Sequence, residues 1–419
     1  MGGMPPGGRN QDEALHELII LRHRFRFIIM KYLRRTLGTS LALAARNFPA
    51  VILTGPRRAG KTTLLRQRFP RAAPVLLEDP DVVARAQADP QGFLDDLTLP
   101  VILDEIQNAP HLFNYIRSRI DAAPERFGQW LLTGSQEAPL MRGVTESMAG
   151  RAAVFHLLPL SVEESPRVSP LRGGFPEVLA RPAAADIWFR SYVQTYLERD
   201  VRAVSSIRDL AAFRRFIGLL ASRCGQMLNK TDLAAPLGVS VPTIGEWLSI
   251  LEITGQILLI PPFYENFGKR LVKSPKLYFA DAGLACHLLG IGSESALRGS
   301  PFLGPIFEGF VASEIVKHRL NRGRVRGLYY FRDQQGLEVD FVIDDGNRRL
   351  TLIEAKATRT ALPVAAAPLR RLAGAVAGYD ASAWLVHAGQ GGKAPAEALC
   401  PGARALGWKN LHAVLEQAP

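Results

Sequence analysis

The sequence predicts an α/β protein whose N-terminal half is organised around a parallel sheet. Short apolar runs, typical of strands buried on both faces, alternate there with stretches of helical periodicity. One of these runs leads directly into a glycine-rich loop, and a later one ends in two adjacent carboxylates. Because 419 residues exceed what one hydrophobic core usually serves, we expect further domains after the first.

The glycine-rich loop, residues 55–62, has the spacing of a phosphate-binding loop. Its backbone N–H groups and the N-terminus of the next helix would converge on phosphate oxygens. Lys61 would neutralise the β- and γ-phosphates, and the Thr62 hydroxyl would complete the coordination of Mg²⁺. A chance glycine turn is the alternative, but a strand signal precedes the loop and a helix signal follows it. The predicted nucleotide-binding residues are Gly55, Pro56, Arg57, Arg58, Ala59, Gly60, Lys61, Thr62 and Thr63.

Two adjacent carboxylates, Asp104 and Glu105, follow the apolar run 101–103. This pattern predicts a buried parallel strand, and ligands bind at the carboxyl ends of such strands. We predict that Asp104 holds the Mg²⁺ through water and that Glu105 polarises the attacking water. A surface-facing acidic turn is the alternative, and the phosphate loop upstream favours the catalytic interpretation.

Polar residues also border the later strands of this domain. Ser135 follows the predicted strand 129–133 and could touch the γ-phosphate or the attacking water, or could cap the next helix, or do both. Arg151 enters the last predicted strand, 150–157. Either Arg151 or Arg142 could act on the γ-phosphate, in its own subunit or in a neighbouring one, although a plain surface role is as well supported for each.

Taken together, these segments resemble the AAA-like ATPases of bacteria and archaea that carry a C-terminal domain of unknown function. The resemblance spans most of the chain and rests on residues 55–62, 103–107, 132–135, 150–151 and 158–161. It implies an ATPase with ATP and Mg²⁺ as cofactors. It also implies a core in which an additional strand lies between the two strands that carry the Walker motifs. Only the Walker motifs are individually specific.

The pattern changes to short helices from residue 210 onward. Residues 231–251 have the spacing of a helix-turn-helix, with Gly238 in the turn and Pro242 near the start of the second helix. The apolar stretches 257–260 and 276–279 would then form the strands of a wing.

The second helix of this unit would present Thr243, Glu246 and Ser249, and it carries no Lys or Arg between residues 241 and 253. Helices that read DNA usually place basic residues beside the phosphate backbone. The sequence of this helix is therefore equally compatible with contact to DNA and with packing against protein. Basic residues occur instead in the wing, at Lys269, Arg270, Lys273 and Lys276, where a solvated turn is the alternative.

A second set of charged residues lies on two predicted strands, 338–343 and 350–356, which are joined by a turn at 344–347. Alternation puts Glu354 and Lys356 on one face, and hairpin pairing can bring Asp340 beside them. Carboxylates that hold a metal and a lysine that orients water or stabilises charge would suit a Mg²⁺-dependent phosphodiesterase.

This spacing resembles the restriction-endonuclease-like PD-(D/E)xK nuclease core, and Glu308 matches the acidic residue of its first helix. The resemblance implies that Glu308, Asp340 and Glu354 bind the metal and that Lys356 is catalytic. Val339 stands where the full motif has proline, a change that removes no ligand. The alternative is a degenerate nuclease fold that binds DNA or a partner with its charged face, because fold does not fix function.

The composition narrows the choice of partner and compartment. A net charge of +12 favours an anionic partner, of which nucleic acid is the commonest, over a basic surface that is merely solvated. Three widely spaced cysteines argue against a disulfide framework or a zinc site and indicate the cytoplasm. No apolar run is long enough to span a bilayer. The basic apolar segment 18–35 could lie on a membrane surface or pack on the domain.

We therefore expect an ATPase whose nucleotide state drives a DNA-directed module with a candidate metal-dependent nuclease site. The alternative is an ATP-dependent switch whose degenerate nuclease-like domain binds nucleic acid or a protein partner without cleavage. A homo-oligomer is compatible with an arginine that acts on a neighbour's nucleotide. The expected segments are a basic extension (1–35), an AAA-like ATPase domain (36–200), a winged-helix-like domain (201–300), a PD-(D/E)xK nuclease-like domain (301–395) and a tail (396–419).

Overall fold

The computed structural model describes residues 33–134, 147–197, 209–263, 274–376, 378–389 and 396–416. The chain from Arg35 onward forms one compact unit. Several predicted positions lie outside the described residues: Ser135, Arg142, Lys269, Arg270 and Lys273, together with the basic extension up to residue 32.

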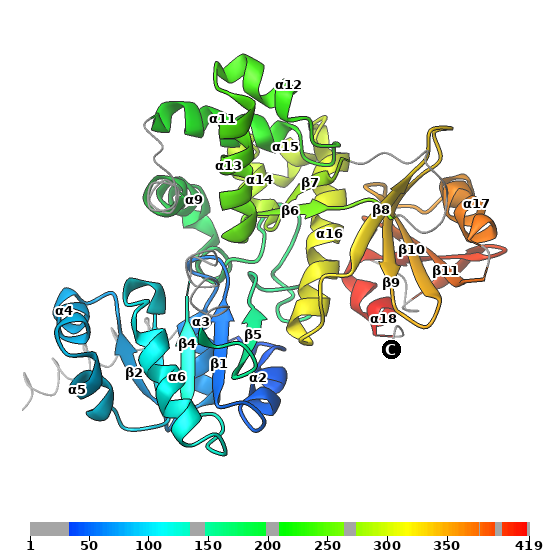
Figure 1. The fold of residues 1–419 in the computed structure, drawn as a ribbon. Helices are drawn as coiled ribbons and strands as arrows, with labels where there is room; N and C mark the ends of the chain where they lie inside the picture. Colours follow the sequence, from blue (N-terminus) through cyan, green and yellow to red (C-terminus); the bar gives the residue numbers. More distant parts are fainter. Residues whose placement is uncertain are drawn as a thin grey trace, which may run out of the picture. The chain divides into compact units, whose positions relative to one another are not determined.

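The first domain is built on a five-stranded parallel sheet with the order β2-β3-β4-β1-β5 (Figure 1). Its strands are β1 (Ala50–Thr54), β2 (Ala73–Leu76), β3 (Val101–Asp104), β4 (Trp130–Thr133) and β5 (Ala152–His156). Strand β4 lies between β1 and β3, which carry the phosphate loop and the carboxylates. The predicted additional strand between these two strands is therefore confirmed.

Helices cover both faces of this sheet. The helices on one face are α2 (Gly38–Ala44) and α3 (Lys61–Arg68), and those on the other are α4 (Pro80–Ala88), α5 (Pro90–Asp95) and α6 (Leu112–Ala122). Along β1, Val51 and Leu53 pack toward the first set, whereas Ala50 and Ile52 pack toward the second. All five residues of β1 are buried, which explains why this strand is apolar without alternation.

The middle of the chain is mainly helical. Its elements are α8 (Pro176–Ala180), α9 (Ala185–Tyr192), a π-helical turn (Val193–Leu197), α11 (Leu210–Ser222), α12 (Lys230–Ala234), α13 (Val241–Ile253), β6 (Ile257–Ile260), β7 (Lys276–Phe279), α14 (Ala282–Leu288) and α15 (Glu294–Gly299). Gly238 turns the chain between α12 and α13 with a φ of 66°, and the Ser240 hydroxyl caps α13 by accepting from the Thr243 N–H. Strands β6 and β7 pair antiparallel. The helices and strands predicted for this region thus form in the predicted order, and their arrangement as a winged helix stays a prediction.

Among the described helices, none is by itself long and apolar enough to cross a membrane. The helical segments 230–237 and 241–253 are long and apolar enough only when they are taken together, and the pair is bent by 110°.

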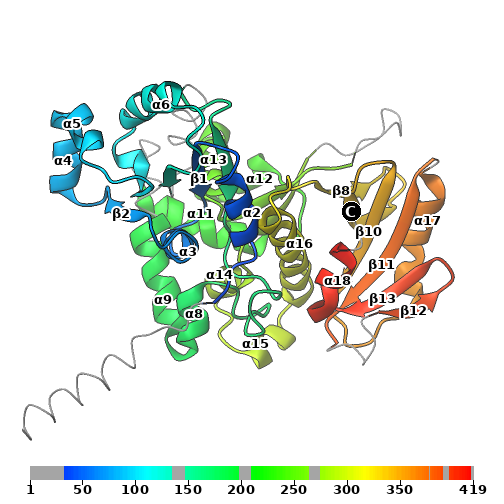
Figure 2. The ribbon, with the colours of Figure 1, turned by 90° about the horizontal axis from the view of Figure 1, so that it is seen from below.

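The C-terminal domain contains a six-stranded mixed sheet with the order β12-β13-β11-β10-β9-β8. Its strands are β8 (Leu328–Arg332), β9 (Glu338–Asp344), β10 (Arg349–Lys356), β11 (Asp380–His387), β12 (Glu397–Cys400) and β13 (Ala403–Gly407). Helix α17 (Ala367–Ala375) covers one face, and α16 (Leu303–Asn321) with α18 (Leu411–Leu415) covers the other (Figure 2). The sheet thus continues past residue 395, where the sequence predicts the end of this domain. The sequence misses β12 and β13 because these strands are too short to give a clear periodicity.

Helix α16 joins the domains through its buried surface. It contacts β5 of the first sheet, β7 of the middle region and β10 of the last sheet (Figure 1). Its side chains are buried all round, as expected for a helix enclosed by protein.

Candidate functional site

The loop between β1 and α3 depends on glycine at both ends. Gly55 and Gly60 have φ values of 137° and 96°, which residues with side chains rarely adopt. A Cβ atom on Gly55 would also lie 2.1 Å from the carbonyl oxygen of Leu157, which follows β5. The backbone therefore curls as a phosphate-binding loop requires.

Lys61 opens α3 and folds its side chain back into this loop. Its Nζ donates to the carbonyl oxygens of Gly55 at 3.0 Å and Pro56 at 3.1 Å, and the residue is buried. A buried ammonium is costly without acceptors or a counter-charge. The two carbonyls hold it at the loop, where nucleotide phosphates would supply that charge.

Thr62 and Asp104, the predicted Mg²⁺ ligands, lie together beyond the carboxyl ends of β1 and β3. Thr62 Oγ1 donates to Asp104 Oδ1 at 2.7 Å. Thr133, the last residue of β4, donates to the same carboxylate oxygen and accepts the Glu105 N–H at 3.1 Å. Hydroxyl and carboxylate oxygens are the ligands that Mg²⁺ prefers, so these residues fit the ion. The sequence does not single out Thr133, although its place at the end of an apolar strand was an available signal.

Glu105 is held in a left-handed conformation, with a φ of 58°. This conformation costs roughly 1–2 kcal/mol for a non-glycine residue, and such strain often occurs at functional sites. The Gln107 amide donates to Glu105 Oε2, and the Arg57 guanidinium lies 4.0 Å from the same oxygen. The carboxylate is therefore fixed directly beside the predicted metal ligand Asp104.

Strand β5 brings His156, but not Arg151, to the loop end of the sheet. His156 Nδ1 lies 3.1 Å from Thr54 Oγ1. Burial, reinforced by nearby cationic side chains, lowers the pKa of His156 to about 3, so the ring is neutral. Arg151 precedes β5 and pairs with Asp121. Because β5 runs parallel to β1, Arg151 lies at the opposite end of the sheet and does not reach the loop of its own chain. An action on a neighbouring subunit stays a prediction.

A turn of the middle domain lies against the phosphate loop. A Cβ atom on Gly255, between α13 and β6, would lie 3.0 Å from Pro56 Cδ and 3.0 Å from His156 Nε2. Tyr192 on α9 lies beside this turn, since its hydroxyl donates to the Arg57 carbonyl at 3.5 Å and accepts from Gln256 Nε2 at 3.1 Å. The loop backbone is thus in direct contact with the middle domain.

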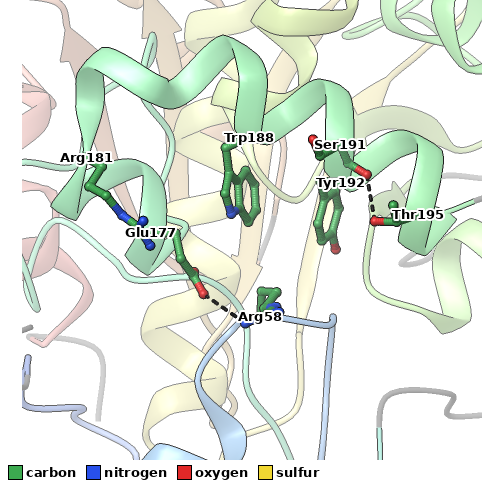
Figure 3. Close-up of a pocket in the computed structure, with 7 residues that line it drawn as sticks. All are labelled: Arg58, Glu177, Arg181, Trp188, Ser191, Tyr192 and Thr195. Carbon is green, nitrogen blue, oxygen red and sulfur yellow. Dashed lines mark hydrogen bonds and ion pairs between the residues drawn. The ribbon is translucent and has the colours of Figure 1, made fainter. Parts of the chain in front are cut away.

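Tyr192 also lines a pocket of about 300 Å³ (Figure 3). Figure 3 shows the rings of Trp188 and Tyr192 projecting from α9 toward the loop segment that carries Arg58. The two rings stack at 5.0 Å, and Arg58 Nη1 lies 3.7 Å from Glu177 Oε1. The other lining residues are Arg181, Ser191 and Thr195. This pocket therefore combines an aromatic face, cations and hydroxyls beside the phosphate loop.

The predicted C-terminal residues meet where β9, β10 and α16 come together. Asp340 Oδ2 accepts the Ala355 N–H at 3.0 Å, and Lys356 Nζ lies 2.5 Å from Glu354 Oε1. Glu308 Oε1 accepts from the Tyr278 hydroxyl at 2.5 Å. The hairpin pairing predicted from the sequence thus brings Asp340 next to Glu354.

Lys276 of β7 enters this cluster. Its Nζ lies 3.1 Å from Glu308 Oε1, 2.6 Å from Glu338 Oε1 and 3.7 Å from Asp340 Oδ1. Burial lowers the pKa of the ammonium, but the surrounding carboxylates outweigh it, and the net shift of this pKa is upward. Burial and the Asp340 charge raise the pKa values of Glu308 and Glu354, each to about 7.

The described part of the chain contains no group of three or more His, Cys, Asp or Glu side chains arranged to hold a metal ion. Glu308, Asp340 and Glu354 lie close together, but the ammonium of Lys276 lies between Glu308 and Asp340. The residues present therefore do not fit the predicted metal.

Three family models match consecutive parts of the chain. An AAA domain covers residues 47–165, and two domains of unknown function, DUF8612 and DUF4143, cover residues 168–295 and 303–394. The first match agrees with the phosphate loop and the parallel sheet, and it identifies a P-loop ATPase domain.

Two mycobacterial proteins are similar over most of their length: uncharacterized protein Rv2008c of Mycobacterium tuberculosis and uncharacterized protein Mb2031c of Mycobacterium bovis. Each is 33% identical over 353 residues, which cover 82% of this chain and 77% of the relative. Among solved structures, the Walker-type ATPase PABY2304 of Pyrococcus abyssi covers 60% of this chain and 94% of its own, with 17% identity and a TM-score of 0.41.

Proposed function

Because this chain belongs to the family of the mycobacterial proteins Rv2008c and Mb2031c and carries an AAA domain, we propose that it is a Mg²⁺-dependent ATPase that drives a DNA-directed module. The contact between Thr62 and Asp104, with Glu105 fixed beside it, carries the ATPase half of the proposal. The middle and C-terminal domains are the proposed module.

Each residue at the loop has a distinct role in the proposed hydrolysis. Thr62 and, through water, Asp104 would hold Mg²⁺, which would supply positive charge at the phosphates. Lys61 would leave its two carbonyl acceptors for the phosphates and stabilise the charge that develops on them. Glu105 would orient the attacking water and accept its proton.

The pocket at Trp188 is the proposed site for the base and ribose of ATP. It is lined by Arg58 of the phosphate loop itself, and its volume of about 300 Å³ is of the order that a nucleoside requires. Trp188, whose ring stacks on the buried Tyr192, offers a flat apolar face to a purine.

Replacing Trp188 with alanine should weaken ATP binding by roughly 5- to 150-fold, because stacking of a base on an aromatic ring is worth about 1–3 kcal/mol. Titration calorimetry with a non-hydrolysable ATP analogue measures this change. Trp188→Phe should retain most of the affinity, and Ile187→Ala, at an exposed neighbour on the same helix, should leave it unchanged. Equal affinity of the Trp188→Ala and wild-type proteins would place the base elsewhere.

The middle domain is the proposed receiver of the nucleotide state. Its turn at residues 254–256 touches Pro56, and Tyr192 touches the Arg57 carbonyl, so a change in the loop on binding phosphates would alter these contacts. The helix-turn-helix order of α12 and α13 and the net charge of +12 support DNA as the partner. The exposed face of α13 carries Glu246, so we assign the DNA contact to the module as a whole and not to this helix.

ATP should change the affinity of the protein for DNA by about fivefold or more, the usual lower range of coupling between two sites. Fluorescence anisotropy with labelled single- and double-stranded DNA, with and without ATP, measures this in a Glu105→Gln protein that retains the nucleotide. Lys61→Ala serves as the control that cannot respond to ATP. DNA binding that is absent in both states would reject DNA and leave a protein partner as the alternative.

Two functions are candidates for the C-terminal domain, metal-dependent cleavage and binding without cleavage. The Lys276 ammonium among the carboxylates favours binding without cleavage.

All three cysteines are free, which suits the cytoplasm as the proposed compartment. A homo-oligomer is proposed only through Arg151, whose half-exposed side chain would act on the nucleotide of a neighbouring subunit.

A further inference from the structure

The carboxylate cluster of the C-terminal domain already contains a cation. The Lys276 ammonium lies within 4.0 Å of carboxylate oxygens from Glu308, Glu338 and Asp340, and its side chain is only 4% exposed. Lys276 does not belong to the C-terminal sheet, because it is the first residue of β7 in the middle region. One region of the chain thus supplies the cation, and another supplies the carboxylates.

The ammonium is fixed in place by its strand. Lys276 pairs with Ile260 in the β6–β7 ladder, and Tyr278 of β7 is fully buried in one hydrophobic core with Phe307 of α16 and Phe341 of β9. Lys276 also lies over the ring of Tyr330, at 5.6 Å from its centroid. The backbone of Lys276 is therefore held beside the cluster, and its buried side chain places the ammonium among the carboxylates.

The oxygens that a metal would need are mostly engaged already. Both oxygens of Asp340 have partners, the Ala355 N–H and the Lys276 ammonium, and Glu354 Oε1 is paired with Lys356. Glu354 Oε2 is buried and has no hydrogen-bond partner in the described structure, but a single oxygen is not a site. A divalent ion bound by carboxylates requires several oxygens together.

We propose that Lys276 is a permanent internal counter-ion that takes the place of a metal in this nuclease-like cluster. The domain therefore holds its carboxylates as an ion-pair network joined to β7 and performs no metal-dependent phosphodiester cleavage. This inference is independent of the ATPase activity, because none of its residues contacts the phosphate loop in the described structure.

Mn²⁺ binding to the full chain, followed by electron paramagnetic resonance, tests this proposal. An Asp104→Asn background removes the metal site of the nucleotide loop. In that background the lysine-containing protein should bind no Mn²⁺. Lys276→Met should create a site for roughly one Mn²⁺ per chain, and adding Asp340→Asn should abolish it. Lys276→Arg, which keeps the cation, and Lys230→Met, which removes an exposed one, should bind none.

Two results would overturn the proposal. The first is Mn²⁺ binding in the Asp104→Asn protein that disappears on addition of Asp340→Asn, since the cluster would then hold a metal with its lysine present. The second is a folded Lys276→Met protein that gains no Mn²⁺. If Lys276→Met fails to fold, the first comparison still decides, together with an assay of Mg²⁺- and Mn²⁺-dependent DNA cleavage. Cleavage that is lost in Asp340→Ala would contradict the proposal in the same way.

Discussion

Replacing Lys61 with alanine is expected to weaken ATP binding by at least about 100-fold, or about 3 kcal/mol. The buried lysine donates to the carbonyls of Gly55 and Pro56, which hold its ammonium at the loop where the phosphates would bind. A charge-assisted contact of this kind is worth more than a neutral one. Calorimetry with ATP and Mg²⁺ measures the affinity.

The matched control for this loss is Arg85→Ala. Arg85 is 59% exposed and pairs with Asp96 on the surface of the same domain. Its removal changes the net charge by the same amount but should leave ATP binding intact, because exposed ion pairs contribute little. An unchanged melting temperature of the Lys61→Ala protein would show that the fold is preserved. Wild-type affinity in a folded Lys61→Ala protein would exclude the loop as the phosphate site.

Replacing Glu105 with glutamine is expected to slow ATP turnover by roughly 10²–10⁴-fold and to keep ATP affinity near that of the wild type. Glutamine preserves the shape of the side chain but cannot accept a proton from water. The hydrogen bond from the Glu105 N–H to Thr133 and the contact between Thr62 and Asp104 do not involve the Glu105 side chain. The metal ligands should therefore stay in place. Phosphate release under single-turnover conditions measures the rate.

Glu125→Gln, at an exposed turn of the same domain, should turn over ATP at the wild-type rate and serves as the control. Normal hydrolysis by Glu105→Gln would remove this residue from the catalytic role and would direct attention to other groups at the loop. A simultaneous loss of ATP affinity would instead indicate that the charge of Glu105 contributes to the conformation of the site, for example through Arg57.

The two variants also separate the halves of the proposed function. The Lys61→Ala protein should stay in the nucleotide-free state, and the Glu105→Gln protein should stay in the ATP-bound state. The turn at residues 254–256 touches the loop in the structure, so any difference in DNA affinity between the two variants would report transmission through the middle domain. Such transmission is a coupling free energy, and it has to be measured at both sites.

The nucleotide site could be predicted largely because its parts are local. Gly55, Gly60, Lys61 and Thr62 lie within one strand-loop-helix unit, whose conformation depends on glycine at two positions. Asp104 and Glu105 end a strand, and parallel strands deliver their ends to the same edge of a sheet. The hairpin that brings Asp340 beside Glu354 was predictable for a similar reason, since period-two alternation and a short turn define its register.

The sequence by itself determined that this protein has a phosphate loop, a parallel sheet and a charged C-terminal hairpin, because these depend on short-range spacing. Only the tertiary structure decided that Thr133 joins Asp104, that Arg151 lies away from the loop and that Lys276 enters the carboxylate cluster. Lys276 and Asp340 are far apart in the chain, and their contact depends on how β7, α16 and β9 pack into one core. No local pattern encodes such a contact, because it follows from side-chain packing among distant segments.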